Sequence, residues 1–332
     1  MNPHPTWSLW RPHSNCGPGC LPDPETTPRV SGPARLGRLV ALLGALVFGA
    51  ALVPVLPLLS RSGRQVAGRT WARAVLRSVG IGLDVRGRPP HRRALLVANH
   101  VSWLDVVTIL AATPARMLAK HEVRRWPLIG PLAALGGVIF VDRTRPRTLP
   151  DTVAEVVAAL RADDVVAVFP EGTTWCGLPR PGGRCGAAGR FRPAMFQAAI
   201  DADAPVVPVH LGYRVAPPGR EPEPSTGPAF LAQESLFSSV RRVLALRGLV
   251  VTLTAVDGSW VDEPWVDGSW VDQPWVDGPA EAGAPTGRRD GRMDRRRLAA
   301  AAQAAVRAAG SPGAPAVRPD RAVEPGTLEL AA

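Results

Sequence analysis

The central part of the chain alternates short, continuously apolar runs with segments whose apolar residues recur at helical spacing. Continuous apolar runs are typical of parallel strands that are covered on both faces. The expected strands are Ala94–Ala98, Gly137–Val141, Val165–Phe169 and Val206–His210. The expected helices between them are Trp103–Ala112, Leu149–Arg161 and Ala194–Ala202. This order predicts an α/β fold with a mainly parallel sheet flanked by helices, in a single domain over 81–255.

A longer apolar segment lies nearer the N-terminus, where residues 39–60 carry no charge. Its length is sufficient to cross a bilayer, which takes about 20 apolar residues. Pro54 and Pro57 interrupt its last third, and arginines flank both ends, so the positive-inside rule selects no orientation. We therefore expect a half-inserted or interfacial helix in a membrane-associated region over 35–80, with a basic amphipathic helix at 66–79. A buried core helix is the alternative.

The two ends of the chain lack such patterns. Residues 1–34 are rich in proline and glycine, and we expect them to form a disordered leader. Residues 256–278 repeat a Trp-Val-Asp motif every five residues. That period matches neither a helix nor a strand, so we expect a loop or disordered arm, with a tryptophan-rich membrane contact as the alternative. The last region, 279–332, is expected to hold an exposed Ala/Arg-rich helix at 295–309 and a disordered tail.

The location of the net charge, +11 in all, narrows the class of partner. Residues 1–93 contain 13 arginines against three acidic side chains, whereas residues 94–332 contain 26 basic and 25 acidic side chains. The basic excess therefore surrounds the apolar segment. A nucleic-acid binder usually carries its basic surface on the folded module together with stacking aromatic residues. We expect an anionic membrane surface as the partner, and no nucleic acid.

The four cysteines show no recognisable framework. Cys16 and Cys20 are four residues apart in the leader, and Cys176 and Cys185 are nine apart in a Gly/Arg-rich stretch. Neither pair has the C-x-x-C spacing of a zinc motif, so we expect free thiols and no metal ion. A metal site built from all four cysteines is the alternative.

Candidate chemistry begins where the first predicted strand ends, at Asn99 and His100, and continues to Asp105. The carboxyl end of a strand that leads into a helix is where α/β folds expose reactive groups. If the turn folds back, the Asp105 carboxylate can fix the tautomer of His100 and leave the other ring nitrogen free to accept a proton. This pair suits the activation of a hydroxyl, and a purely structural pair is the alternative.

Two further clusters follow predicted strands. Residues 169–174 read Phe-Pro-Glu-Gly-Thr-Thr, where Gly172 permits close backbone approach and neighbouring amides can hold an anion. Glu171 is unusual at such a place unless it bonds a donor or a substrate hydroxyl. An Asp-Arg pair ends the strand at 137–141, and its Arg143 can bind a phosphate through two hydrogen bonds. A simple Pro-Glu-Gly turn and a surface ion pair are the alternatives.

Taken together and in this order, the clusters resemble the motifs of the lysophospholipid acyltransferase family of glycerolipid acyltransferases, over roughly residues 65–250. The N-H-x4-D motif is matched by Asn99, His100 and Asp105. A G-x-I-F-x-D-R strand is matched over 137–143, the F-P-E-G-T motif over 169–173, and a short apolar stretch with proline over 206–209. A K-x-E-L segment followed by P-x-x-G is matched by Lys120, Glu122, Pro127 and Gly130, with Val123 in place of leucine.

The resemblance implies that His100 and Asp105 are catalytic. The substrate-binding residues that it implies are Lys120, Arg143, Glu171, Gly172, Thr173 and Thr174. Lys120 is the only lysine in the chain, which indicates that a compact ammonium is needed there. The glycerol-phosphate acyltransferases usually carry arginine where this chain has Thr174, and the E-G-T-T form is similar to branches that act on other lysolipids, such as lyso-ornithine lipids. The remaining positive charge can come from the loop arginines Arg180, Arg184, Arg190 and Arg192.

The resemblance also implies direct acyl transfer on the cytoplasmic face of the cell membrane, without a metal or an organic cofactor. His100 takes the proton from the acceptor hydroxyl, which attacks the thioester of acyl-CoA or acyl-carrier protein. The implied acceptor is a lysolipid, 1-acyl-glycerol-3-phosphate, with lyso-ornithine lipid as an alternative. A non-catalytic lipid-binding membrane protein is a further alternative, and so is a thioesterase, although the chain lacks a G-x-S-x-G motif.

Overall fold

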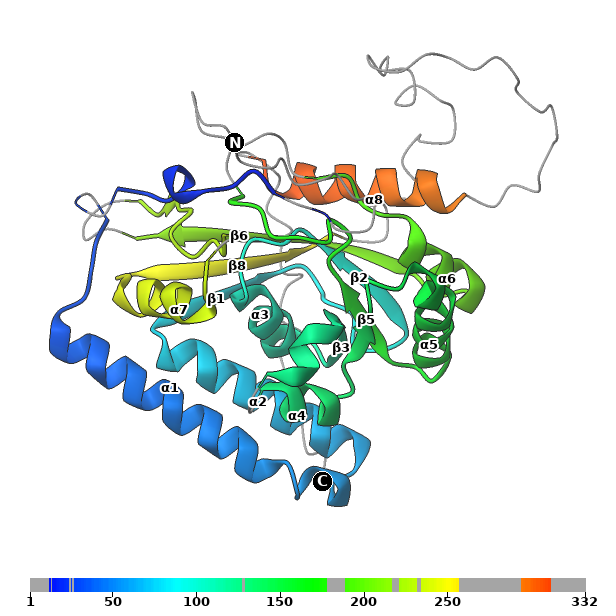
Figure 1. Cartoon of the computed structure of the whole chain (residues 1–332), viewed down its shortest axis with the longest axis horizontal. Coiled ribbons are helices and arrows are strands. Elements are labelled where there is room, and N and C mark those ends of the chain that lie inside the picture. Colours follow the sequence, from blue (N-terminus) through cyan, green and yellow to red (C-terminus); the bar gives the residue numbers. More distant parts are fainter. Residues whose placement is uncertain are drawn as a thin grey trace, which may run out of the picture.

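The computed structural model describes residues 14–23, 27–126, 129–177, 189–216, 221–231, 234–256 and 294–311, together with Pro12 and Glu25. Its centre is an eight-stranded, mainly parallel sheet flanked by helices, which confirms the predicted fold class (Figure 1). The strand order is β1-β8-β6-β2-β5-β3-β4, and β7 pairs with β6 outside this path. The strands are β1 (Ile81–Arg86), β2 (Ala94–Ala98), β3 (Ala115–Lys120), β4 (Ile139–Val141), β5 (Val165–Val168), β6 (Val206–Val215), β7 (Glu223–Pro224) and β8 (Leu249–Ala255).

The longest helices lie at the two ends of the described chain. The α-helices are α1 (Gly32–Leu52), α2 (Arg61–Ser78), α3 (Leu104–Ala112), α4 (Ile129–Leu135), α5 (Leu149–Arg161), α6 (Ala194–Ala202), α7 (Leu236–Ala245) and α8 (Arg295–Ala309). The 3-10 helices are η1 (Pro18–Cys20), η2 (Leu56–Leu58), η3 (His121–Arg125) and η4 (Pro146–Thr148). The predicted bounds of β2, α5 and α6 agree with the structure, whereas β1, β3, β8 and α7 have no counterpart in the sequence analysis.

The direction of the strands brings the candidate motifs to one edge of the sheet. Neighbouring strands β2, β5, β3 and β4 are all parallel, so their carboxyl ends meet on the same side. The segments after these four strands begin at Asn99, Phe169, His121 and Asp142. On the other side of β2, β6 is parallel to it and β8 is antiparallel to β6.

Alternate side chains of β2 enter two different cores, which explains why all five of its residues are buried. Leu95 and Val97 pack with residues of α5, α6 and α8 on one face of the sheet. Leu96 and Ala98 pack on the opposite face, with residues of α3. The central strand therefore has no solvent-facing side, as the continuous apolar pattern predicted.

Helix α8 has the predicted bounds but not the predicted exposure. Ala299, Ala302 and Val306 are buried, and the helix contacts α6 and β6 (Figure 1). The expectation of an exposed helix was wrong, because the small alanine side chains let α8 lie close to the sheet. The side chain of Gln303 reinforces this docking by donating to the carbonyl of Gly189 at 2.8 Å.

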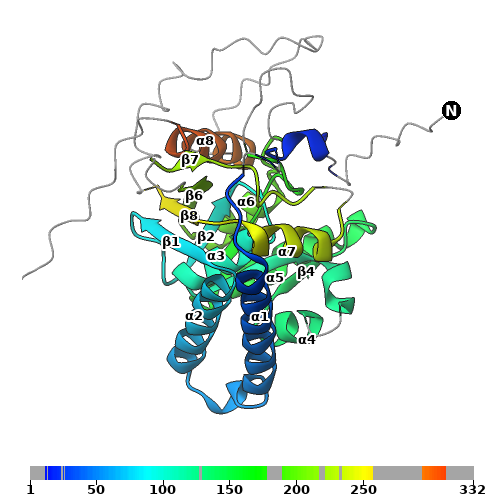
Figure 2. The same cartoon turned by 90° about the vertical axis from the view of Figure 1, so that its left-hand side faces the viewer.

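Helices α1 and α2 form a hairpin that projects from the domain (Figure 2). Helix α1 ends at Leu52, two residues before Pro54, as expected for a residue that cannot donate to the helix. The indole N–H of Trp71 on α2 donates to the carbonyl of Ala45 at 2.9 Å. Glycine at position 49 permits this close packing, since a Cβ there would lie 2.3 Å from the indole nitrogen.

Helix α1 exposes most of its apolar surface. Within the described residues it is the one helix long and apolar enough to cross a membrane. Large apolar side chains that remain exposed on it are Leu36, Leu39, Val40, Leu43, Val47 and Phe48. Arg38 fixes its base to the domain by donating to the carbonyls of Leu244 and Leu246 at the end of α7. The alternative of a buried core helix therefore does not fit.

The described part of the leader is folded against the domain, which corrects the expectation of disorder for this part of 1–34. Ser14 and Cys16 are buried, and the hydroxyl of Thr226 donates to the carbonyl of Cys20 at 2.7 Å. Further along, the N–H of Val30 donates to the carbonyl of Ala245 at 2.9 Å. Composition alone missed these contacts because their partners lie more than 200 residues away. The predicted repeat, apart from Val256, and residues 312–332 lie outside the described residues.

Candidate active site

The His–Asp pair is assembled by the turn between β2 and α3. Asp105 lies in the first turn of α3, and its carboxylate faces back toward the end of β2. Its Oδ2 lies 2.9 Å from Nδ1 of His100. A carboxylate accepts only, so Nδ1 carries the proton and Nε2 is left as the basic nitrogen. The structure thus brings together the two residues that the sequence predicted to be catalytic.

Asp105 is held rigidly, because it is completely buried and every oxygen is used. Besides His100, its Oδ2 accepts the backbone N–H groups of Val101 at 2.6 Å and Ser102 at 2.8 Å. Its Oδ1 accepts the hydroxyl of Tyr213 from β6, at 2.5 Å. Burial and the adjacent Asp105 raise the pKa of this tyrosine well above its usual range, so the phenol remains a donor. Such a network fixes one orientation of the carboxylate.

Tyr213 is a site residue that the sequence analysis missed. It is the only tyrosine of the chain, and it lies 108 residues beyond Asp105. No local motif marks it. The only available signal was its position in the extension of the predicted strand 206–210, on a strand parallel to the one that precedes His100.

His100 is fixed from the other side by the turn after β5. The Phe169 ring stacks on the imidazole with centroids 3.9 Å apart. The backbone N–H of His100 donates to Oε2 of Glu171 at 2.9 Å, and its carbonyl accepts the N–H of Trp175 at 2.8 Å. The sequence analysis expected an acidic residue at this position only if it bonds a donor or a substrate hydroxyl, and Glu171 accepts the N–H of His100. The two motifs form one site.

Asn99 has a structural role in this site. Its side-chain amide donates to the carbonyl of Leu211 at 2.9 Å and accepts the N–H of the same residue at 2.8 Å. These two bonds continue the pairing of β2 with β6 beyond the last ladder position. The amide thereby fixes where the chain leaves the sheet, just before His100.

Burial controls the charge of Glu171. The residue is only 4% exposed, and this desolvation raises its pKa to about 8, with a smaller contribution from the charge of Asp105. The hydrogen bond from the His100 N–H acts in the opposite direction. The carboxyl group is therefore largely protonated at neutral pH, and it can donate a hydrogen bond as well as accept one.

We expect Glu171→Gln to remove part of the pH dependence of stability. The pKa of Glu171 rises from 4.5 in the unfolded chain to about 8 in the folded protein. The folded state therefore binds more protons, and the wild type should lose stability as the pH rises from 4.5 to about 8. The melting temperature of the wild type should therefore fall relative to that of Glu171→Gln as the pH rises through this range. Parallel curves would contradict the shift, and Glu155→Gln, an exposed glutamate on α5, is the matched control.

Positive charge gathers around Gly172. This glycine has φ +76°, and a Cβ there would lie 2.7 Å from Pro12, 3.5 Å from Arg192 and 3.6 Å from Arg143. Arg143 donates to the Gly172 carbonyl, and burial together with the charge of Arg192 lowers the pKa of Arg143. Two guanidinium groups that repel each other at a glycine turn are suited to an anion. The N–H of Gly172 itself is used by the carbonyl of Phe169.

Lys120 joins this group from the end of β3. It pairs in register with Val141, so it lies beside the strand end that leads to Arg143. Its residue surface is largely exposed, yet the surrounding protein atoms and the charge of Arg143 lower its pKa. A long lysine side chain can keep its ammonium in water while protein atoms cover its stem.

The two threonines of the motif have different surroundings. Thr173 is half-buried, whereas Thr174 is buried and its hydroxyl donates to the carbonyl of Phe230 at 2.6 Å. Thr174 thus joins the turn to a neighbouring loop. Of the loop arginines, Arg190 and Arg192 are described, and the backbone N–H of Arg192 donates to the Pro170 carbonyl at 3.0 Å. Arg180, Arg184 and Pro127 lie outside the described residues.

Comparisons with known proteins show which family the chain resembles. The model of the family described as Acyltransferase matches residues 83–212. The 1-acyl-sn-glycerol-3-phosphate acyltransferase of Neisseria meningitidis serogroup B is 33% identical over 186 residues, covering 55% of this chain and 68% of the relative. The lyso-ornithine lipid O-acyltransferase of Pseudomonas aeruginosa is 31% identical, covering 62% of this chain and 78% of the relative.

Among solved structures, the crystal structure of the 1-acyl-sn-glycerophosphate acyltransferase from Thermotoga maritima aligns with a TM-score of 0.45 at 19% identity. The alignment covers 68% of this chain and 85% of that chain. The family model spans His100, Asp105 and Glu171, and the relative from Neisseria meningitidis is covered over more than two thirds of its length. The chain therefore belongs to the lysophospholipid acyltransferase family.

Proposed function

We propose that this acyltransferase transfers a fatty acyl group from acyl-CoA or acyl-carrier protein to the hydroxyl of 1-acyl-glycerol-3-phosphate, giving phosphatidic acid. The observation that carries the proposal is that a histidine–aspartate pair and a cluster of cations lie at the same edge of the sheet. The His100–Asp105 pair supplies a base, and Lys120, Arg143 and Arg192 supply positive charge around Gly172. A base beside a cluster of cations matches an acceptor with a free hydroxyl near a phosphate.

The chemical step follows from the orientation of His100. Nδ1 donates to Asp105, so Nε2 takes the proton from the acceptor hydroxyl. The oxygen then attacks the thioester carbonyl carbon, and the carbon–sulfur bond breaks as the tetrahedral intermediate collapses. The leaving thiolate takes up the proton from the imidazolium. Asp105 stabilises the imidazolium between these two transfers, because its carboxylate remains within hydrogen-bond distance.

Lyso-ornithine lipid is the second candidate acceptor. Thr174 stands where the glycerol-phosphate acyltransferases usually carry arginine, and several curated relatives are lyso-ornithine lipid O-acyltransferases. Since the Thr174 hydroxyl is engaged by Phe230, this position adds no charge to the site. A zwitterionic headgroup needs less positive charge than a phosphate does. The preference between the two acceptors therefore depends on how much the cations around Gly172 contribute to binding the headgroup.

The proposed location is the cytoplasmic face of the cell membrane. Helix α1 presents an apolar surface that the described residues leave uncovered, and the arginine excess of residues 1–93 surrounds it. Apolar insertion and attraction to anionic lipids together hold a protein at a bilayer more firmly than either does alone. The same surface would place the enzyme next to both its lipid acceptor and its product.

A panel of lysolipids tests the proposal. Purified protein is incubated with labelled acyl-CoA and either 1-acyl-glycerol-3-phosphate, lyso-ornithine lipid or lysophosphatidylcholine. We expect the phosphate acceptor to give the highest kcat/KM, and Lys120→Met to lower that value roughly tenfold to a hundredfold, since a charged hydrogen bond contributes about 1.5–3 kcal/mol. Arg147→Met removes an equal charge from the exposed η4 and should leave kcat/KM unchanged.

The outcomes of the panel separate the candidates. Preference for lyso-ornithine lipid with no effect of Lys120→Met would contradict the phosphate assignment and support the second acceptor. Release of free fatty acid without any acylated lipid would identify a thioesterase. A protein that binds lysolipid but forms no product with any acceptor, from acyl-CoA or from acyl-carrier protein, would be a non-catalytic lipid-binding protein.

A further inference from the structure

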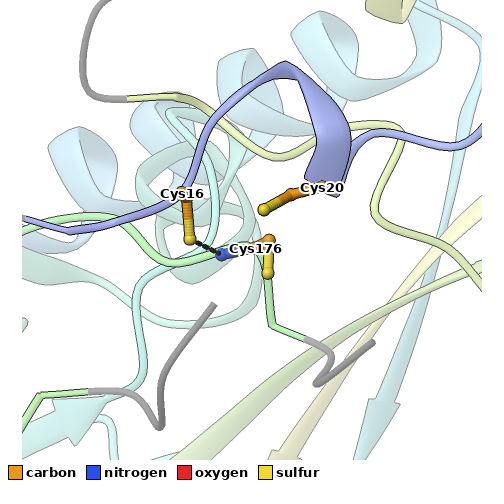
Figure 3. Close-up of side chains that lie close together, drawn as sticks. All are labelled: Cys16, Cys20 and Cys176. Carbon is orange, nitrogen blue, oxygen red and sulfur yellow. Dashed lines mark hydrogen bonds between the residues drawn. The ribbon is translucent and has the colours of Figure 1, made fainter. Parts of the chain in front are cut away.

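Three cysteines that are far apart in the sequence meet beside the active-site turn. Cys16 and Cys20 come from the leader, and Cys176 comes from the segment after the Phe-Pro-Glu-Gly-Thr motif (Figure 3). Their three sulfur atoms lie within 4.8 Å of one another, and none of the three forms a disulfide. The sequence spacing alone gave no sign that these three side chains would meet. The fourth, Cys185, lies outside the described residues.

The leader is shaped so that it presents two thiols to the same point. The segment between Cys16 and Cys20 turns tightly, because Gly17 caps η1 (Pro18–Cys20) and the N–H of Cys20 donates to the carbonyl of Gly17 at 2.9 Å. This tight turn brings the ends of a five-residue segment together. The third thiol closes the triangle from a different part of the chain, 156 residues beyond Cys20 by sequence number.

A backbone donor already points at one of the three sulfur atoms. The backbone N–H of Cys176 donates to Sγ of Cys16 at 3.2 Å, as Figure 3 shows. An N–H aimed at sulfur stabilises its negative charge, which is the form that binds metal ions. Cys16 and Cys176 are only 7% and 5% exposed. Burial by itself disfavours a thiolate, so a bound cation would be needed to hold these side chains in the form that coordinates metal.

The spacing of the sulfur atoms fits zinc. In tetrahedral sites the Zn–S distance is about 2.3 Å, which places neighbouring sulfur atoms about 3.8 Å apart. The three thiols need to close in by no more than about an ångström to reach this geometry, and the Gly-Pro-Gly turn can accommodate that. A disulfide would join two of the sulfurs and leave the third without a role.

A cross-link of this kind would add to the contacts that hold the leader in place. Within the described residues 14–23, Ser14 and Cys16 are buried, and Cys20 and Leu21 pack partly buried against the core cluster that contains Cys16. Ordering a short Pro/Gly-rich segment costs conformational entropy, which these few contacts must offset. Metal coordination supplies such free energy directly, because the site forms only when the segment is folded.

We infer that Cys16, Cys20 and Cys176 bind one Zn²⁺ ion as thiolates, and that this ion fixes the leader against the active-site turn. A fourth position on the metal is left for water or another ligand. The consequence for catalysis is positional. Cys176 follows Trp175, whose N–H holds the His100 carbonyl, and the leader places Pro12 over Gly172. Zinc would thus set the shape of the site without taking part in the reaction.

Metal analysis of the full chain tests this inference. Protein purified in detergent without chelators should contain about one zinc per chain by inductively coupled plasma mass spectrometry. Cys16→Ser, Cys20→Ser and Cys176→Ser should each lose most of it, whereas Ser14→Ala, a buried leader residue without a thiol, should retain it. Wild-type protein reloaded with Co²⁺ should show a thiolate-to-cobalt charge-transfer band that the serine variants lack.

Other results would overturn the inference. Wild-type protein with neither zinc nor a cobalt band after reconstitution would exclude the site, even if the serine variants fail to fold. So would peptide mapping of unreduced protein that finds a disulfide between any two of the three cysteines, or an iron–sulfur chromophore. Zinc retained in all three serine variants would place the metal elsewhere. None of these measurements depends on acyl transfer, so they stand apart from the proposed function.

Discussion

His100→Ala is expected to lower acyl transfer by ~10²–10⁴-fold, because it removes the group that takes the proton from the acceptor hydroxyl. The imidazole is partly exposed, with 19% of its side chain accessible, and its Nδ1 bond to Asp105 leaves Nε2 for the acceptor. The backbone bonds of His100 to Glu171 and Trp175 do not involve the ring, so the fold should survive the change. Initial rates with labelled acyl-CoA and a saturating lysolipid measure the loss.

A matched histidine variant and a vesicle-binding assay are the controls for this experiment. His91→Ala removes an imidazole from an exposed loop and should keep the full rate. Both variants should float with vesicles that contain phosphatidylglycerol to the same extent as the wild type. Unchanged turnover of His100→Ala would reject the assignment of the base. Failure of the wild type to float would reject the membrane location and leave the catalytic assignment standing.

Asp105→Asn should produce a loss of similar size, on the order of 10²–10⁴ in kcat, because in a His–Asp pair this change favours the wrong tautomer of the imidazole. Asp105 Oδ2 accepts from His100, Val101 and Ser102, and an asparagine amide offers a single acceptor oxygen for donors that now face both of its ends. The KM for the lysolipid should change little, since Asp105 is completely buried and does not touch the acceptor.

Tyr213→Phe is the informative comparison for this prediction. It deletes the donor to Oδ1 and leaves the carboxylate beside His100 in place. We expect a smaller fall in kcat, together with a loss of stability of about 1–3 kcal/mol for the unpaired oxygen. Equal losses of kcat in the two variants would show that rigid packing, rather than the carboxylate itself, sustains the reaction. Melting curves of each variant separate the two effects.

Local sequence pattern predicted the elements whose identity depends on nearby residues. The bounds of β2, α5 and α6 could be predicted because continuous apolar runs and helical spacing reflect burial against the sheet. Two of the missed strands, β1 and β3, carry weaker patterns, whereas β8 alternates clearly and was overlooked. Strand β1 lies at the sheet edge with Asp84 and Arg86 in it, and β3 contains Arg116, whose guanidinium reaches the Gly137 carbonyl at 2.8 Å.

The catalytic pair was within reach of sequence reasoning, because five residues in one strand–turn–helix unit determine whether His100 and Asp105 can meet. The side chains that hold this pair in place could not be predicted in the same way. Tyr213 reaches Asp105 only because β6 lies beside β2, and Glu171 reaches His100 only because β5 lies on the other side. The packing of the whole chain decides which strands become neighbours. The hydrophobic periodicity of a single segment does not contain this information.

The sequence by itself determined the family, the exposed apolar helix and the chemistry of the His–Asp turn, since each depends on residues that are close along the chain. The tertiary structure determined which distant segments become neighbours. It set the strand order, gathered the cations around Gly172 and placed the leader against Cys176. The physical reason is that the contacts between distant segments form only when both are folded. The described part of the Pro/Gly-rich leader, predicted to be disordered from its composition, instead packs beside the active-site turn, where Cys16 and Cys20 lie close to Cys176.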